Sequence, residues 1–483
     1  MDPTLSSLSH IPLEDIYTLL RPITVTPSSS EAVFQNWGRT FRCTPLAVFE
    51  PETEYQCELI LELARREGQT VRAVGVGHSP SDLACTSGYM VRMGKLNNII
   101  EVNAEKRSVR AQGGITLQRL HAGLEAHGLA MINLGSISEQ TLAGMVTTAT
   151  HGTGITHQIL STHVQQLTLL LANGSRVRCS RSDRPDLFLA SLCGLGSTGL
   201  ILDVQLLVTP AFRLREVQET FKFDSIVDNL DEMVNSAEYV RLWWWPQAGD
   251  VRLSTMDKTL EPKRPVGSWL WHSLIGYHVV QFLLLLGRFI PPLNIWIGRF
   301  TSWLVNNRTV SVDNSLNIFN LDCKYRQHTT EWAFPYENTQ ACLRELRGWF
   351  EDEFADPNGL RPHCPLEVRF SEADDVWLSP SYGQRMCWIG IIQYKPYGFN
   401  VPYRQLFRRF EAIVIRHGGR PHWAKAHHLR PDRLRALYPR FDDFRHLLED
   451  VDPEGLFRNE YVSRHIFGQK GAGFDERVFK ERP

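Results

Sequence analysis

The order of apolar and polar positions along the chain predicts a protein of the α+β or α/β class. Between Asn36 and Pro210, short β-branched runs alternate with segments whose apolar positions recur at helical spacing. Residues 46–68 indicate a short strand followed by an amphipathic helix, and residues 116–128 indicate a helix that Gly128 ends. Further strands are predicted at 70–74, 109–112, 168–171 and 201–208.

Beyond Pro210 the composition shifts toward Trp, Arg and Pro, which favours a second domain. Longer helices alternate there with strands, and one helix over 406–417 ends at Gly418. The strands are predicted at 241–246, 251–255, 367–370 and 386–393. We therefore expect an N-terminal extension at 1–35, a first domain at 36–210, a second domain at 211–470 and a tail at 471–483.

An apolar segment at 266–287 contains no Asp, Glu, Lys or Arg. Its length approaches the roughly 20 residues that one membrane-spanning helix needs. Polar residues such as His272 and Gln281 interrupt it, and Pro291 and Pro292 follow soon after. Three interpretations stay open at this point: a hairpin buried in a soluble core, a helix lying on a membrane surface, and a spanning helix.

Charge and composition exclude several classes of protein. The chain has 483 residues, with Lys+Arg 52 against Asp+Glu 53 and a net charge of -1, so a binder of nucleic acid through bulk charge is not expected. An apolar fraction of 43% is enough to close a globular core, which excludes a disordered chain. The first 26 residues are acidic and lack an early apolar run, so neither a secretory signal nor a mitochondrial presequence is expected.

Cysteine and histidine spacing argues against a metal site. Nine cysteines are scattered without a CxxC pair, which disfavours structural zinc and a disulfide framework and is typical of buried thiols in a reducing compartment. His422, His427 and His428 lack the HExxH spacing and have no carboxylate among them. We therefore expect no metal.

Three glycine-rich loops indicate a large, phosphate-bearing ligand. The GxGxxG run at 194–199 follows a predicted helix and precedes a predicted strand, the reverse of a Rossmann turn. The loop at 74–82 follows a strand, and its backbone N–H groups can form an anion nest, although Pro80 removes one donor. The loop at 134–154 is rich in small and hydroxyl residues and lets a ligand approach the backbone closely.

Three motifs together resemble one family. They are the run at 74–82 with its Gly77-His78-Ser79, the Thr150-His151-Gly152-Thr153-Gly154 loop, and His422-Trp423-Ala424-Lys425. The chain resembles the FAD-dependent sugar-1,4-lactone oxidases (D-arabinono-1,4-lactone and L-gulonolactone oxidases) of the vanillyl-alcohol oxidase superfamily, from about Asn36 to about Phe467. The resemblance implies a two-domain, PCMH-type FAD-binding fold, with an FAD domain at 36–210 and an α+β substrate (cap) domain at 211–470.

The resemblance also implies how the cofactor is held. FAD would be bonded covalently, through its 8α-methyl group, to the ring of His78. Ala149 stands where many relatives have glycine, near the flavin by analogy, so it bears on access of oxygen. The residues expected to bind FAD are His78, Gly75, Gly77, Ser79, Gly135, Ser136, Gly144, Thr148, His151, Gly152, Thr153, Gly199 and Ile201.

The expected catalytic residues come from the second domain. Glu367 and Arg369 stand two residues apart in a predicted strand, so their side chains share one face. Taken alone, they form an ordinary ion pair. The resemblance implies that they meet Lys425 at the flavin, where Arg369 and Lys425 would hold the substrate hydroxyl and its developing charge while Glu367 orients them. His422 and Trp423 would line the substrate pocket.

The implied reaction is that of an oxidoreductase acting on CH–OH with oxygen as acceptor. An aldono-1,4-lactone, with D-arabinono-1,4-lactone first, would lose hydride from C2 to flavin N5. Oxygen would become hydrogen peroxide and the product an ascorbate-type ene-diol. Three alternatives stay open: a gulono- or galactono-lactone oxidase or dehydrogenase, an alditol oxidase, and an inactive membrane-associated interaction protein.

The expected partners are a neutral sugar lactone, molecular oxygen and a membrane surface, with no nucleic acid. By the same resemblance the protein is expected at a mitochondrial membrane, with the endoplasmic reticulum membrane or the cytosol as alternatives.

Overall fold

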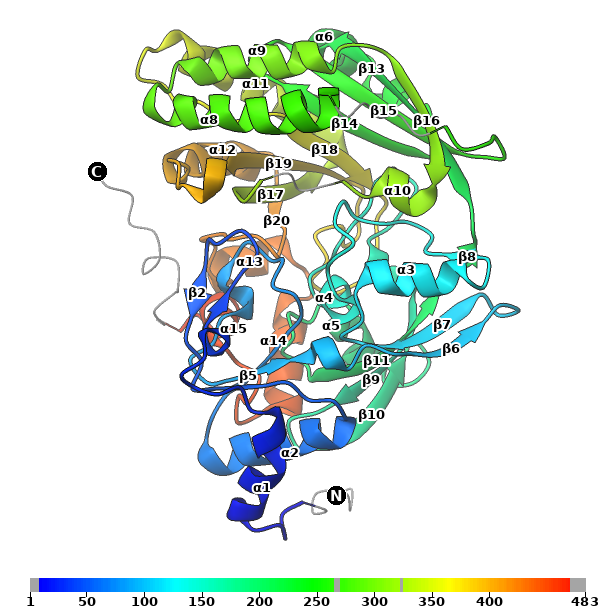
Figure 1. Ribbon diagram of the computed structural model, residues 1–483, viewed down its shortest axis with the longest axis vertical. Coiled ribbons are helices and arrows are strands. Elements are labelled where there is room, and N and C mark those ends of the chain that lie inside the picture. The colour runs from blue at the N-terminus through cyan, green and yellow to red at the C-terminus, as the bar shows by residue number, and fades with distance from the viewer. Residues whose placement is uncertain (1–7, 265–269, 322–324, 470–483) are drawn as a thin grey trace.

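The computed structural model describes residues 8–264, 270–321 and 325–469. An eight-stranded sheet with its helices forms the upper half of the molecule in Figure 1, and a five-stranded and a three-stranded sheet with their helices lie in the lower half. The two larger sheets are antiparallel and the three-stranded sheet is parallel, so the described residues do not form one doubly wound parallel sheet, and the predicted α+β class is confirmed. The predicted boundary near Pro210 falls at the short strand β12 (Thr209–Pro210) and stays a prediction.

A three-stranded parallel sheet carries the first glycine loop. Its order is β3 (Ala47–Phe49), β5 (Tyr89–Arg92), β4 (Val71–Val74). Helix α2 (Glu54–Glu67) joins β3 to β4, begins with a capping box between Thr53 and Gln56, and ends at Gly68 in the left-handed conformation. Helix α1 (Leu13–Leu20) packs on α2 at one face of this sheet, and a short ribbon of β1 (Phe34–Gln35) and β2 (Arg42–Cys43) packs on the other face, in a core with Val48, Val74 and Met90.

A five-stranded antiparallel sheet carries the other two loops. Its order is β10 (Arg176–Ser180), β9 (Val164–Leu170), β11 (Leu200–Leu207), β7 (Ser108–Gln112), β6 (Ile99–Asn103). Helices α3 (Leu117–Glu125), α4 (Leu142–Thr147) and α5 (Pro185–Ser191) belong to this part, and β8 (Leu129–Ala130) pairs with β12. The loop at 194–199 runs from α5 into β11, so the order that excludes a Rossmann turn is confirmed.

The large antiparallel sheet forms the second half. Its order is β16 (Thr309–Asn314), β13 (Arg213–Lys222), β15 (Asp250–Thr259), β14 (Tyr239–Trp245), β18 (Leu366–Ser371), β19 (Met386–Tyr394), β17 (Gln327–Pro335), β20 (Arg420–Pro421). The associated helices are α6 (Phe223–Val227), α7 (Leu230–Val234), α10 (Ser315–Phe319), α11 (Thr339–Ala355) and α12 (Arg404–Arg416). Strands β17 and β19 are buried on both faces, because α12 packs on one face and the lower half closes on the other.

The C-terminal part of the chain returns to the first half. Helices α13 (Pro431–Leu437), α14 (Phe441–Val451) and α15 (Glu460–His465) follow the large sheet (Figure 1). Arg464 donates to both carboxylate oxygens of Asp82 at 2.8 and 2.9 Å, and Asn459 donates to the backbone oxygens of Leu83 and Cys85. The loop that carries Lys425 is therefore held between the two halves.

The predicted apolar segment lies mostly within a helical hairpin. Residues 266–269 fall outside the described residues, and the rest form a π-helix, η6 (Leu270–Val279), and most of α8 (Val280–Phe289). Helix α9 (Leu293–Leu304) runs back beside α8 (Figure 1), and Val280, Leu284 and Ile297 form a small core with Tyr325. Within the described ranges, no helix combines the length and the apolar character needed to cross a membrane.

Candidate active site

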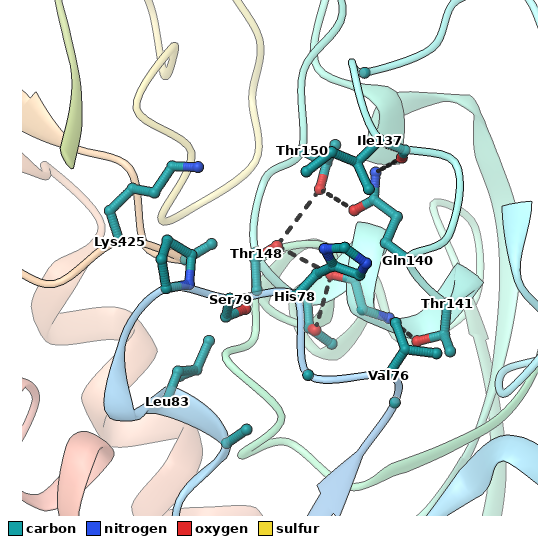
Figure 2. Close-up of a pocket in the computed structure, with 18 of the residues that line it drawn as sticks. Val76, His78, Ser79, Leu83, Ile137, Gln140, Thr141, Thr148, Thr150 and Lys425 are labelled. Carbon is teal, nitrogen blue, oxygen red and sulfur yellow. Dashed lines mark hydrogen bonds between the residues drawn. The ribbon is translucent and has the colours of Figure 1, made fainter. Parts of the chain in front are cut away.

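One pocket lies between the glycine loops of the first half and the strands β17 and β18 of the large sheet. It has about 960 Å³ of empty space, including its open mouth. Its lining comes from the loop after β4, from residues 135–137, from the α4 region up to His151, and from Glu331, Arg369, His422 and Lys425. Figure 2 shows His78 within it, with Thr148, Thr150 and Gln140 nearby and Lys425 extending from another wall. Motifs that are far apart in the sequence thus meet in one cavity.

His78 is held at one end of this pocket. Its ring stacks on Trp37, with centroids 5.4 Å apart and an interplanar angle of 22°. Its Nε2 contacts Glu139 Oε2 at 3.1 Å, whereas its Nδ1 is buried without a hydrogen-bond partner among the described residues. Burial lowers the pKa of His78, so the ring is neutral near pH 7. A neutral ring that donates from Nε2 leaves the lone pair of Nδ1 free.

The glycines of the first loop allow two walls of the pocket to approach closely. A Cβ atom on Gly75 would lie 2.4 Å from Thr141 Oγ1, and Gly77 has a φ of 73°. Thr141 caps α4 by accepting from Gly144 N at 3.2 Å. The approach to Thr141 therefore requires glycine at 75, and the left-handed backbone favours glycine at 77.

A chain of hydrogen bonds fixes the opposite wall (Figure 2). Thr148 Oγ1 donates to the backbone oxygen of Gly144 at 3.0 Å, Thr150 Oγ1 donates to Gln140 Oε1 at 3.2 Å, and Gln140 Nε2 donates to the backbone oxygen of Ile137 at 2.9 Å. Each bond joins one part of the 134–154 loop to another, which gives a preorganised surface of hydroxyl and amide groups.

Strand register places two carboxylates side by side at the end of the pocket away from His78. Glu331 on β17 and Glu367 on β18 both pair with Gly390 on the strand between them. Arg369 pairs with Trp388, two residues along, so its side chain shares this face of the sheet. Gly390 has no side chain, which leaves room for the two acidic side chains on either side.

Glu331 is the centre of this cluster and was not predicted from the sequence. Its Oε1 accepts from His151 Nε2 at 3.1 Å and from Arg369 Nη2 at 3.2 Å, and its Oε2 lies 3.5 Å from Lys425 Nζ. Burial alone would raise the pKa of Glu331. Lys425, His151 and Arg369 together outweigh this effect and hold the pKa well below its usual range, so the carboxylate is ionised. The available signal was an acidic residue directly before the apolar run Trp332-Ala333-Phe334.

Lys425 reaches Glu331 because its loop is anchored on both sides. His422 N donates to the backbone oxygen of Glu331 at 3.0 Å, and Lys425 N donates to the backbone oxygen of His422 at 2.8 Å. Trp423 is fully buried, and its indole N–H donates to the backbone oxygen of Leu378 at 2.7 Å. Trp423 therefore anchors the turn and does not line this pocket, where the sequence had placed it.

Two buried histidines complete this end of the pocket. Burial lowers the pKa of both His151 and His422, so both rings are neutral. His151 stacks on Trp388 with centroids 3.8 Å apart, and a neutral ring donates to Glu331, the stronger of its two acceptors. His422 Nδ1 accepts from Ala424 N at 3.1 Å, which leaves Nε2–H as the donor.

His151, Glu331 and His422 also have the geometry of a possible metal site, with ligand atoms within 4.8 Å of one another. Arg369 and Lys425 contact the same carboxylate, so two cations already neutralise its charge. This arrangement disfavours a third cation, and the expectation of no metal stays a prediction.

The predicted site residues divide into those on the pocket wall and those beside it. Twelve of them line the pocket: His78, Gly75, Gly77, Ser79, Gly135, Ser136, Gly144, Thr148, His151, Arg369, His422 and Lys425. Glu367 lies just behind the wall, 3.2 Å from Arg369 and bonded to Ser136 Oγ at 3.4 Å. The others off the lining are Gly152, Thr153, Gly199, Ile201 and Trp423.

Arg72 is a second lining residue that the sequence did not reveal. Its guanidinium donates to the backbone oxygen of Leu195 at 2.7 Å and supports the 194–199 loop. Burial lowers the pKa of Arg72 to about 10, which still leaves it charged at neutral pH.

The residues present fit FAD. The wall offers backbone and hydroxyl donors at points of close approach, as a dinucleotide requires, and the buried Nδ1 of His78 and Nε of Arg369 are unpaired among the described residues. Residues 45–180 match the family of FAD-binding domains, and residues 204–465 match the D-arabinono-1,4-lactone oxidase family.

Known proteins similar to this chain include several lactone oxidoreductases. An L-gulonolactone oxidase of Scyliorhinus torazame is 41% identical over 435 residues, covering 90% of this chain and 98% of that protein. A D-arabinono-1,4-lactone oxidase of Eremothecium gossypii is 31% identical, covering 81% and 83%, and an L-gulono-1,4-lactone dehydrogenase of Mycobacterium tuberculosis is 30% identical, covering 89% and 98%.

The fold is similar to that of cholesterol oxidase from Brevibacterium sterolicum, with a TM-score of 0.76 and 16% identity over 92% of this chain and 99% of that chain. This likeness over 92% of the chain, together with the FAD-binding match over residues 45–180, confirms the predicted fold of the vanillyl-alcohol oxidase type, and the domain boundaries stay predictions. The chain belongs to the D-arabinono-1,4-lactone oxidase family of FAD-dependent oxidoreductases.

Proposed function

We propose that this protein oxidises an aldono-1,4-lactone at C2, with molecular oxygen as acceptor and hydrogen peroxide as co-product. The observation that carries the proposal is the convergence of Arg369, Lys425 and His422 around Glu331, in the same pocket that His78 lines. A neutral lactone agrees with this site, because its two cations are already balanced by Glu331 and Glu367.

The side chains can supply what alcohol oxidation demands of a protein. When bound, FAD accepts the hydride and later passes electrons to oxygen. Arg369 and Lys425 donate to the substrate hydroxyl and stabilise negative charge as it develops on that oxygen. His422 Nε2–H is a further donor, while Glu331 keeps the two cationic side chains aimed at one point.

L-gulono-1,4-lactone is the first substrate to test, because relatives of that name share 40–41% identity with this chain, against 31% for the Eremothecium gossypii D-arabinono-1,4-lactone oxidase. D-arabinono-1,4-lactone is the second candidate. The assay measures oxygen consumption and peroxide with each lactone. Near-equal amounts of peroxide and product support the oxidase, whereas turnover with a dye acceptor and little peroxide would replace it by a dehydrogenase.

A variant pair connects the activity to this site. Lys425→Met removes the ammonium 3.5 Å from Glu331 Oε2 and is expected to lower kcat/KM by about a hundredfold or more. Arg385→Met is the matched control, because Arg385 is half-exposed and pairs with Glu372 away from the pocket lining, so its loss is expected to leave the activity unchanged. Equal activity of Lys425→Met and Arg385→Met would remove this pocket from the reaction.

We also propose that FAD is attached to His78 Nδ1. A buried, neutral and unpaired ring nitrogen on the pocket wall is the supporting observation. After acid precipitation the wild-type pellet is expected to stay yellow, and the band in a denaturing gel to fluoresce. His78→Ala is expected to lose both signals. A fluorescent band from His78→Ala would assign the link to another residue.

A further inference from the structure

The two ring nitrogens of His78 lie in different surroundings. Nε2 lies 3.1 Å from Glu139 Oε2, and Nδ1 is buried with no hydrogen-bond partner among the described residues. A carboxylate accepts hydrogen bonds and donates none, so it favours the neutral tautomer whose proton is on Nε2. The lone pair of the ring then stands on Nδ1, the nitrogen to which FAD is proposed to be attached.

The position of Glu139 is fixed by the backbone on both sides of it. The backbone oxygen of Ser138 accepts from Gln118 N, and that of Gln140 accepts from Leu117 N, each at 2.9 Å. The side chain of Glu139 is 66% exposed and therefore contributes little to the core. The fixed backbone and the contact with the histidine ring point to a role in directing that ring rather than in folding.

Trp37 fixes the plane of the histidine ring by stacking on it. The backbone of this segment is bonded to the His78 loop on both sides of the ring, because Trp37 N donates to the backbone oxygen of Gly77 at 2.8 Å and Asn36 Nδ2 donates to that of Ser79 at 3.0 Å. The guanidinium of Arg326 lies 4.7 Å from the ring of Trp37 and donates to its backbone oxygen. A rotation that exchanged the two histidine nitrogens would therefore break both the stacking and the contact with the carboxylate.

We propose that Glu139 is the positioning residue for the attachment of FAD: it holds the ring proton of His78 on Nε2 and accepts that proton as Nδ1 bonds to the 8α carbon. This inference rests on the proposed attachment to His78. One C–H bond of the 8α-methyl group breaks and one N–C bond forms, and the electron pair of the C–H bond passes to the flavin ring system, which is reduced. The methyl proton and the Nε2 proton are released, and molecular oxygen takes up the two electrons and two protons as hydrogen peroxide.

Covalent and total flavin, measured in the complete protein, test the proposal. Samples are taken at purification and during incubation with excess FAD in air; flavin in the acid-precipitated pellet is covalent, and absorbance before precipitation gives the total. Glu139→Asp keeps an acceptor and is expected to attach FAD nearly as wild type does. Glu139→Lys donates to Nε2 and shifts the ring proton to Nδ1, so attachment should be slowed about a hundredfold or more while total bound flavin stays unchanged. Glu139→Gln, whose amide can either accept or donate, should lie between these two variants.

Glu345→Lys is the matched control, because Glu345 Oε2 contacts His417 Nε2 at 2.6 Å in a second glutamate–histidine pair away from the pocket lining. It is expected to attach FAD like wild type, and unchanged thermal unfolding shows that each variant is folded. The proposal is overturned if Glu139→Lys attaches FAD as fast as wild type does, or if it loses total bound flavin in the same proportion as covalent flavin. A wild-type protein that releases all of its flavin on acid precipitation would instead refute the attachment to His78, and this inference with it.

Discussion

Glu331 is the carboxylate that holds His151, Arg369 and Lys425 together in the pocket. In Glu331→Gln the amide oxygen can replace Oε1 and keep the bonds from His151 and Arg369. The amide NH₂ then takes the place of Oε2 and faces the ammonium of Lys425, which lies 3.5 Å away in the wild type. A donor facing a cation is repulsive, so we expect Lys425 to move while Arg369 stays.

The size of the effect follows from the distances. At an effective dielectric constant of about 20, cations at 3.2 and 3.5 Å each attract the carboxylate by about 5 kcal/mol before desolvation is counted. Desolvation offsets much of this, and removing one partner of a buried pair costs about 3–5 kcal/mol. Arg369 keeps Glu367 at 3.2 Å, so we expect a loss near 3 kcal/mol in the free energy of unfolding. Displacement of Lys425 should lower kcat/KM by about a hundredfold.

Denaturant unfolding measures the loss in the free energy of unfolding, and steady-state oxygen uptake measures the loss in kcat/KM. Unfolding at several pH values tests whether the lost charge of Glu331 is the cause of the lower stability. The pKa of Glu331 is depressed in the folded protein, so its stabilising contribution is present above the pKa of the unfolded chain and is lost as pH falls through the folded pKa. The stability difference between wild type and Glu331→Gln should therefore shrink in acid. Glu367→Gln is the matched control, because Glu367 is 21% exposed and should cost about 1 kcal/mol. Equal stability and near wild-type kcat/KM for Glu331→Gln would refute the reasoning.

Three further predictions test other parts of the structure. Gly75→Ala should reduce bound flavin, measured by absorbance, because its Cβ would lie 2.4 Å from Thr141 Oγ1, and Thr141→Ala in the same chain should restore part of the loss. Ala149 has a φ of 54°, so in thermal unfolding Ala149→Gly should change stability by less than about 1 kcal/mol, whereas Ala149→Val should lose clearly more. Burial raises the pKa of Asp374 to about 7, so ionising it disfavours the fold, and wild-type stability should fall as pH rises from about 4 toward 7. Asp374→Asn should lack that decline in melts across the same pH range.

The sequence reveals the residues of the pocket that lie in contiguous motifs. His78 stands among glycines directly after a β-strand, and Lys425 follows His422 within a short turn, so local order is enough to find both. Glu367 and Arg369 are found in the same way, because period-two spacing within one strand puts them on one face. The helix ends at Gly68 and Gly128 likewise follow from local signals.

The residues that the sequence does not reveal are those placed by pairing between distant strands. Strand β17 was not predicted, since both of its faces are buried and its run shows no alternation of apolar and polar positions. Glu331 becomes a neighbour of Glu367 only because β17 and β18 both pair with β19 at Gly390. Local patterns do not reveal Arg72 for the same reason, since the 194–199 loop that it supports lies more than a hundred residues away.

The placement of Glu331 by strand pairing, outside the contiguous motifs, has a chemical consequence for the site. Arg369 and Lys425 are two cations in one poorly hydrated pocket. The carboxylate of the predicted motifs is Glu367, which pairs with Arg369, whereas Lys425 pairs with Glu331. An ammonium held beside a guanidinium in such a place needs an anion of its own. Glu331 provides it from a strand outside every motif, and the same strand binds the backbone of the Lys425 loop through His422. The position and the charge of Lys425 therefore depend on one strand, so a change in the register of β17 should disable the site even with every motif residue intact.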